Sequence, residues 1–189
     1  IQTASAALDG TVLDLTDVAA DTDNKVTARS FNYPGVFKNN TVLKEFIAPE
    51  MTSVGASEFE GCTVLTNVVI SGDATSLSEA PFKGCTSLSA FSPRVFPKMA
   101  SLGGNVFDGC TALTGSFEFG EVTEFKNRVF ADSGITMVKA PKLQKISATS
   151  AYPAFKNTPI NGTLEFPLLK NIPRNCFLNC GLAGLKVAG

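Results

Sequence analysis

The five cysteines carry the most distinctive chemistry in this 189-residue chain, because thiolates can ligate metals, form disulfides or act as nucleophiles. They are Cys62, Cys85, Cys110, Cys176 and Cys180. None of them forms a Cys-x-x-Cys pair, and the chain contains no histidine, the usual partner of cysteine in zinc sites. We therefore expect no metal and no cofactor, and we expect free buried thiols rather than disulfides.

An acidic run near the N-terminus has spacing similar to that of a calcium loop. It consists of Asp14, Asp17, Asp21 and Asp23. The fifth loop position counted from Asp21 is Lys25, and no glycine follows it, so the EF-hand pattern fails. We interpret the run as part of a solvated loop.

No constellation of residues indicates catalysis. Histidine, the main acid–base group at neutral pH, is absent, and no Gly-x-Ser-x-Gly segment occurs. The pair Gly103-Gly104 is not followed by the Lys-Ser or Lys-Thr of a phosphate loop. Glu118 and Glu165 would lie two strands apart, at roughly 9 to 10 Å, with Lys139 between them, which is too far for a retaining glycosidase pair. We expect a protein that is not an enzyme.

Charge and hydropathy exclude two classes of partner. Sixteen Lys plus Arg balance seventeen Asp plus Glu, giving a net charge of −1, so binding to nucleic acid by phosphate neutralisation is not expected. No stretch reaches the roughly 18 to 20 apolar residues of a transmembrane segment. The chain begins at Ile1 without a signal-peptide pattern, which we interpret as a processed or trimmed N-terminus.

An internal repeat in the sequence determines where the functional side chains lie. The segments 59–65, 82–88 and 107–113 are near copies of Phe-x-Gly-Cys-Thr-x-Leu, and four degenerate copies flank them. The seven leading phenylalanines are Phe37, Phe59, Phe82, Phe107, Phe130, Phe155 and Phe177. Their spacing of 22 to 25 residues lies in the range of leucine-rich repeats.

Each unit also contains an apolar, any, apolar triplet, whose period of two predicts a short strand. Thirteen of the fifteen phenylalanines occupy repeat positions, and only Phe31 and Phe96 do not. Recurrence once per unit favours core packing over an aromatic ligand site. The residue three after each leading phenylalanine is small and able to hydrogen-bond backbone groups, so we expect an internal ladder. The ladder residues are Asn40, Cys62, Cys85, Cys110, Ser133, Thr158 and Cys180.

The predicted fold is a single leucine-rich-repeat solenoid over residues 1–189, of the α/β horseshoe class but dominated by short parallel strands. Pro81, Pro153 and Pro173 precede the next phenylalanine, where they would interrupt a long helix, so little helix is expected. Residues 1–36 should form an N-terminal cap with a first strand at 10–15, and residues 37–189 should form about seven repeats of a right-handed coil.

The unit resembles the BspA-like, or Treponema-type, leucine-rich repeat, in which a ladder Cys or Asn precedes the strand and an Ala-Phe pair closes the unit. The alanine is present at Ala154 and replaced elsewhere. The replacements are Val36, Glu58, Pro81, Val106, Val129 and Cys176. The resemblance implies a bacterial solenoid, secreted or anchored at the cell surface, that adheres to proteins or cells.

The outward position in the middle of each strand forms one predicted column. It comprises Asp14, Ile47, Val69, Ser92, Glu118, Lys139, Glu165 and Lys186. From Glu118 onward opposite charges alternate, which predicts a surface ladder of ion pairs, each flanked by opposite charge.

In the N-terminal half of this column Ile47 and Val69 would be exposed beside Ser92, and an adjacent apolar pair on a surface suggests a partner. We predict a binding patch of these three residues with Lys44, Thr66 and Asn67 at its rim. A surface whose groups interact only with one another, without a partner, remains the alternative. The partner would be a protein or a glycan.

The C-terminal segment 185–189 ends on a strand without a polar cap, which solenoids normally need. Either the native chain continues or this edge, including Val187, associates with another copy. The second functional hypothesis is therefore a structural or assembly module.

Overall fold

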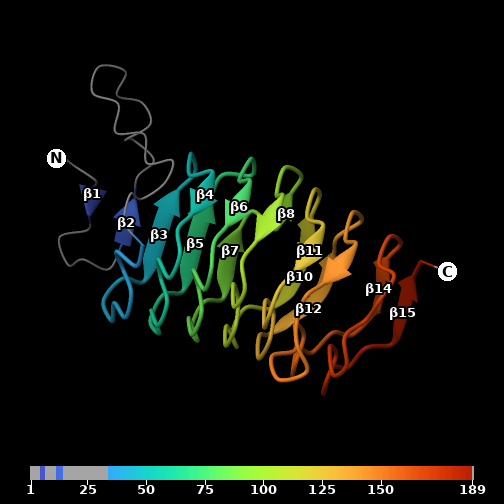
Figure 1. Ribbon diagram of the computed structural model, residues 1–189. Helices are drawn as coiled ribbons and strands as arrows, with labels where there is room; N and C mark the ends of the chain where they lie inside the picture. The colour runs from blue at the N-terminus through green and yellow to red at the C-terminus, as the bar shows by residue number, and fades with distance from the viewer. Residues whose placement is uncertain (1–4, 7–11, 15–33, 189) are drawn as a thin grey trace.

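The computed structural model describes residues 5–6, 12–14 and 34–188, and over these residues the chain is a solenoid of short strands without helix. Successive coils lie side by side along one axis (Figure 1). The strands of one face are β1 Ser5–Ala6, β2 Val12–Asp14, β3 Glu45–Ala48, β5 Asn67–Ile70, β7 Ala90–Ser92, β8 Val95–Phe96, β10 Gly115–Phe119, β12 Ile135–Lys139, β14 Thr163–Phe166 and β15 Gly184–Val187. Those of the second face are β4 Ser53–Val54, β6 Ser76–Leu77, β9 Ser101–Leu102, β11 Glu124–Phe125 and β13 Lys145–Ile146.

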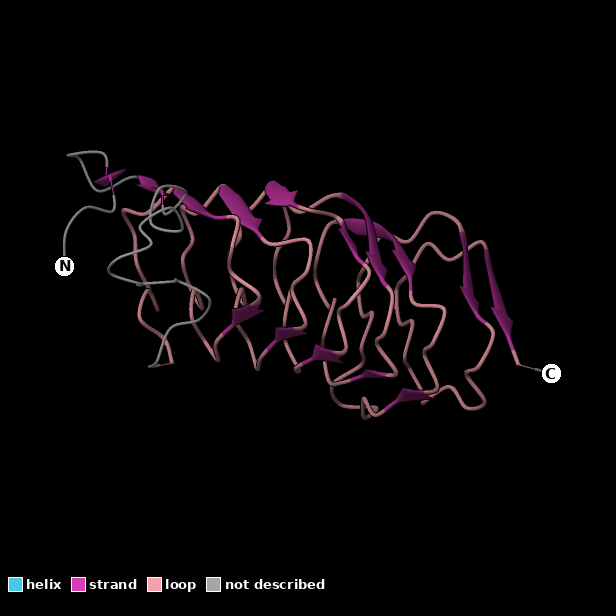
Figure 2. Ribbon diagram, turned by 90° about the horizontal axis from the view of Figure 1, so that it is seen from above, coloured by secondary structure: helices cyan, strands magenta, loops and turns pink. Residues whose placement is uncertain are grey.

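The first face consists of three sheets rather than one. They have the strand orders β1-β2-β3-β5-β7, β12-β10-β8 and β14-β15. The second face carries β4-β6-β9 and β11-β13, and Figure 2 shows the two rows of strands separated by loops. Every pairing is parallel except that of β1 with β2. The predicted fold class is confirmed, and β2 lies within the range in which the first strand was expected.

The leading phenylalanines form one column through the core. Consecutive rings lie nearly parallel, with centroids 5.0 to 6.2 Å apart from Phe37 to Phe177. The five internal rings are fully buried, whereas Phe37 and Phe177 at the two ends are half-buried. Each ring therefore gains its packing from the coils on either side, so the stack supplies what a three-residue strand lacks alone.

Phe96 also belongs to the core, which corrects the expectation that it lies outside the repeat. Its side chain has no exposed surface, and its ring stacks on Phe119 at 6.0 Å. The register pairs Phe96 with Phe119 and Val95 with Glu118. Three extra residues between Phe91 and Leu102 displace this position along the chain and divide the strand into β7 and β8. Phe31, the other exception, lies outside the described residues.

The predicted ladder is confirmed, and its direction is now defined. The thiols of Cys62, Cys85, Cys110 and Cys180 donate to the carbonyl oxygen of the leading phenylalanine one coil earlier, at 2.6 to 3.1 Å. The Thr158 hydroxyl does the same at 2.8 Å. Ser133 differs, because its hydroxyl donates to Phe130 within its own coil. At the N-terminal end the Asn40 side chain accepts from the amides of Val42 and Leu43 instead.

The glycine of the Phe-x-Gly-Cys turn has a backbone reason. Gly61, Gly84 and Gly109 have φ values of 74 to 76°, in the left-handed region that lacks a steric cost only for glycine. In the degenerate copies the position holds Asn or Asp, which tolerate this region better than other residues. Two of these, Asp132 and Asn157, also hydrogen-bond side chain to side chain at 2.6 Å. Sequence variation at the turn therefore preserves its conformation.

Candidate functional site

The predicted patch lies on the five-stranded sheet in the register that the repeat predicts. Ile47 on β3 pairs with Val69 on β5, and Val69 pairs with Ser92 on β7. Ser92 is exposed, but Ile47 and Val69 are half-buried rather than fully exposed as expected. Neighbouring strands at about 4.8 Å cover the flanks of each side chain, because every outward residue contacts the next one in its column.

The three rim residues are adjacent in space and partly occupied by bonds within the solenoid. Thr66 donates its hydroxyl to the carbonyl oxygen of Lys44 at 3.0 Å. Asn67 donates its side-chain amide to Glu45 at 3.4 Å. Lys44 is exposed, while Thr66 and Asn67 are half-buried. The structure thus brings the patch and its rim together on one surface with mixed polar and apolar character.

Val95 belongs to the same face and was missed by the sequence argument. Its side chain is 52% exposed, more than either Ile47 or Val69, and it lies in register with Glu118. The sequence does contain a signal, because Phe96-Pro97 matches the Ala48-Pro49 ending of an earlier strand. The neighbouring Arg94 lies 4.5 Å from the ring centre of Phe117.

The charged half of the column is only partly as predicted. Lys139 pairs with Glu118 at 3.8 Å and Lys186 with Glu165 at 2.6 Å. In the described part of the chain no ion pair joins Lys139 to Glu165, so the expectation that each charge is flanked by opposite charge on both sides is wrong there. The reason is that β12 and β14 belong to different sheets.

A groove of about 460 Å³ opens between β12 and β14 instead. Its lining combines the charges of the column with apolar side chains, among them Met137, Pro141 and Pro167. Similarly, Ser92 is not the neighbour of Glu118, because β8 intervenes. The outward column is therefore interrupted twice.

The thiols are buried in the joints between coils. Cys62, Cys85, Cys110 and Cys176 are buried, Cys180 is partly exposed, and all five are free. Burial raises the pKa of each thiol, to about 12 for Cys176, which suppresses the reactive thiolate. Among the residues that the structure describes, no group of three or more His, Cys, Asp or Glu could hold a metal ion.

The acidic run of the N-terminal region lies largely outside the described residues. Asp17, Asp21 and Asp23 are not described, whereas Asp14 belongs to β2, where its backbone pairs with that of Ile47.

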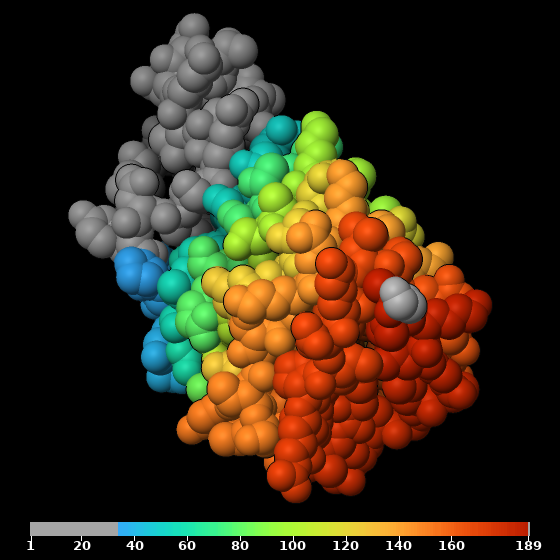
Figure 3. All heavy atoms as spheres, turned by 45° about the vertical axis from the view of Figure 1, so that its right-hand side comes forward, coloured from blue at the N-terminus to red at the C-terminus, as the bar shows by residue number. Residues whose placement is uncertain are grey.

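The C-terminal end of the solenoid, which Figure 3 turns toward the viewer, exposes apolar side chains. Val187 on β15 is 37% exposed and Leu178 is 41% exposed. Phe177, Leu182 and Leu185 pack against the core but remain half-buried, because no further coil covers them within the described chain. The surface has the apolar composition of a joint between two coils.

The stacked strands, the phenylalanine column and the thiol ladder define a leucine-rich-repeat solenoid, as the comparisons with known proteins bear out. The chain belongs to the BspA-type leucine-rich repeat family, whose model matches residues 33–159 in six copies. Phe177 lies beyond this match, but its ring stacks on Phe155 at 5.0 Å as in the other coils.

Two solved structures are similar. A leucine-rich repeat protein from Bacteroides ovatus has 22% identity and a TM-score of 0.61, over 82% of this chain and 39% of that protein. A leucine-rich cell surface protein from Faecalibacterium prausnitzii has 16% identity and a TM-score of 0.37, over 81% of this chain and 62% of that protein. The chain thus spans less than two thirds of either protein. No curated protein matches it, and its described part contains no helix long and apolar enough to cross a membrane.

Proposed function

We propose that this chain is a non-catalytic recognition module, presented at the cell surface or secreted, whose five-stranded sheet face binds a protein partner. The observation that carries the proposal is the patch of Ile47, Val69 and Ser92, continued by Val95. Ile47, Val69 and Ser92 lie in register on neighbouring strands of this sheet, and Val95 lies on β8 of the adjoining three-stranded sheet. A partner therefore meets a fixed surface of strands rather than mobile loops. A glycan partner is the alternative for this same face.

The composition of the face supports this assignment. Interface centres are depleted in charge and contain apolar side chains within a polar rim. The column has this character from β3 to β8, where Ile47, Val69, Ser92 and Val95 carry no charge. From β10 onward the column carries charges that pair among themselves. One half of the sheet face is thus available to a partner, and the other is occupied by its own ion pairs.

The test is a binding screen against extracellular-matrix proteins, serum proteins and surface glycans, with two matched double variants. Ile47→Ser with Val69→Ser should weaken binding of a detected partner by about tenfold or more. Glu118→Ser with Lys139→Ser changes the same column in its charged half and should leave binding within about threefold. The proposal would be overturned if the first variant bound the partner as tightly as the unmodified chain. It would also be overturned if the folded chain bound no member of the panel.

A second function, assembly through the C-terminal end, is favoured by the exposed Leu178 and Val187. These side chains, with half-buried Leu185, offer an apolar surface of the kind that one coil presents to the next. Self-association through it predicts a mass that rises with protein concentration. Val187→Lys would place a charge in this contact and should restore the monomer mass in sedimentation experiments. Val95→Lys, at an exposed valine remote from the C-terminal end, should not.

A further inference from the structure

A four-residue insertion breaks the regularity of the solenoid on the side remote from the patch. From the last apolar strand residue to the next leading phenylalanine the interval is five residues in the other coils, as from Phe125 to Phe130, but nine from Ile146 to Phe155. The extra residues form a turn in which the Tyr152 amide donates to Thr149 at 3.0 Å. Insertions in repeat proteins form surface loops and often belong to binding sites.

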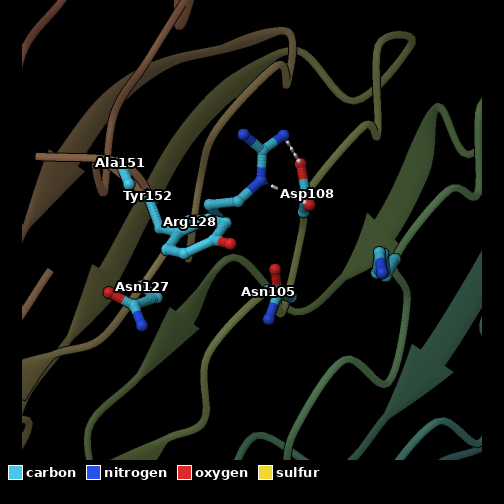
Figure 4. A pocket seen from close by; sticks show the side chains of 7 residues that line it. Asn105, Asp108, Asn127, Arg128, Ala151 and Tyr152 are labelled. Carbon is cyan, nitrogen blue, oxygen red and sulfur yellow. Dashed lines mark hydrogen bonds and ion pairs between the residues drawn. The ribbon is translucent and has the colours of Figure 1, made fainter. Parts of the chain in front are cut away.

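The turn forms one side of an open pocket of about 500 Å³ on the neighbouring coils (Figure 4). Polar side chains of three successive coils line most of the pocket, and Tyr152 of the loop lines one side of it. They are Lys83, Asn105, Asp108, Asn127, Arg128 and Tyr152. The volume is that of a small-molecule site.

Each charged side chain that lines the pocket has a partner of opposite charge. Arg128 donates two bonds to Asp108, at 2.8 and 2.6 Å, and one to Asp132 at 2.6 Å. The Asp108 side chain is only 7% exposed, so this pair is a fixed part of the wall. Lys83, the other cation, lies 3.6 Å from Glu60, a carboxylate that it shares with Lys38 at 2.9 Å. The pocket therefore offers hydrogen-bonding groups without an unpaired charge, which favours an uncharged ligand.

Two amides are held in place by bonds on their outer edges. Asn105 donates its Nδ2 to Glu79 at 2.8 Å, and Asn127 accepts the Thr149 amide on its Oδ1 at 3.0 Å. Within residues 34–188 no bond engages Asn105 Oδ1 or Asn127 Nδ2. An acceptor and a donor of fixed position thus remain for a ligand.

The aromatic ring completes the arrangement. Tyr152 is 55% exposed, and Figure 4 shows its ring beside the stem of Arg128 with the hydroxyl directed toward the side on which Asn105 lies. An exposed flat ring next to fixed amides is complementary to a pyranose, whose C–H face packs on the ring while its hydroxyls exchange hydrogen bonds with the amides.

We propose that this pocket binds an uncharged pyranose residue of a glycan, with Tyr152 as the stacking platform and Asn105 and Asn127 as hydroxyl partners. The site lies on different elements from the sheet-face patch and is independent of it. A chain with both sites would engage two ligands at once.

The experiment measures binding of glucose, galactose, mannose, N-acetylglucosamine and their oligosaccharides to the full chain by calorimetry and ligand-observed NMR. Tyr152→Ala should weaken the bound sugar by about tenfold or more, because the platform is lost. Tyr152→Phe retains the ring and should stay within about threefold. Ile47→Ser with Val69→Ser should change nothing, which separates this site from the sheet face.

Three outcomes would overturn the proposal. The first is the failure of the folded chain to bind any neutral saccharide in the series. The second is binding that Tyr152→Ala leaves unchanged. The third is a preference for sialylated or sulfated sugars over neutral ones, since that would require an unpaired cation in the pocket. Asn105→Gly removes a hydroxyl partner on another coil, suits the positive φ of that position and keeps the bond from Thr149 to Asn127 that holds the turn; it should also weaken the sugar, and it provides a second variant if Tyr152→Ala fails to fold.

Discussion

The thiol of Cys110 lies 3.1 Å from the carbonyl oxygen of Phe82 and donates a hydrogen bond to it across the joint between two coils. Phe82 is also the residue on whose ring Phe107 stacks, at 5.9 Å. One coil thus holds the next through a polar contact and an aromatic contact only three residues apart in sequence. The short Phe-x-Gly-Cys segment therefore supplies both of these contacts.

Phe107→Ala should destabilise the chain by about 3 to 5 kcal/mol, because the ring is fully buried and its loss leaves a cavity between Phe82 and Phe130. Thermal or urea unfolding measures the loss. Phe177→Ala is the control, and it should cost less because that ring is half-buried and has a neighbour on one side only. Equal costs at the two positions would contradict the stacked column.

The native chain should react slowly with a thiol reagent near pH 8, with Cys180 reacting first. Burial raises the pKa of all five thiols above the ordinary value, but Cys180 alone is partly exposed to the reagent. After denaturation without reductant, all five thiols should react. A count below five would show that a disulfide had formed.

Glu58 should make stability depend on pH. The carboxyl is fully buried without a hydrogen-bond partner. Glu58 directly precedes a leading phenylalanine, and later coils have Val106 and Val129 at this position. Desolvation raises its pKa from 4.5 to about 7, and the nearby backbone of Val36 offsets a smaller part. The folded state therefore keeps the proton up to about pH 7, whereas the unfolded chain releases it near pH 4.5.

Because the folded chain binds more protons in this interval, its stability should fall as the pH rises from 4.5 to 7 and level off above 7. Melting temperatures at pH 5 and 8 measure the effect. Glu58→Gln should abolish the part of the slope due to this carboxyl, and Glu58→Val should raise the melting temperature at pH 8 more than at pH 5. An unchanged slope in Glu58→Gln would exclude this carboxyl as its source.

Gly103→Ala should destabilise the chain by roughly 1 to 3 kcal/mol, because a Cβ there would overlap the carbonyl of Ser78 in the preceding coil and approach the amide of Glu79 to 2.6 Å. Gly72→Ala is the matched control, since its Cβ would meet only Pro93 at an ordinary 3.7 Å. Urea unfolding of both variants compares them. Similar stabilities would mean that the coils are less closely apposed at Ser78.

Much of the architecture follows from short-range repetition in the sequence. The stacking of Phe59 on Phe82, the bond from Cys85 to Phe59 and the pairing of Ile47 with Val69 each follow from placing equal residues of consecutive units side by side. Parallel stacking fixes these neighbours because every coil repeats the same path. Their prediction needs no knowledge of distant contacts.

The features that could not be predicted arise where the units differ. The insertion before Phe96 changes which residue adjoins Glu118, and the bulge in β12 accompanies the break before β14. The pocket at Tyr152 combines a loop with residues two coils away, and repeat alignment gives no weight to such an irregular segment. The length of an insertion can be counted in the sequence, but the direction in which the extra residues leave the solenoid depends on packing.

The uniform joint has an evolutionary consequence. Removing residues 60–82 would connect Phe59 directly to Lys83, Gly84 and Cys85, and the Cys85 thiol would then face Phe37 as Cys62 does now. Because the junctions from Phe37 to Phe107 use the same contacts, a gene encoding such a chain can gain or lose whole units there by recombination without redesigning these contacts. The length of the exposed face is therefore a trait that selection can adjust in steps of a single coil.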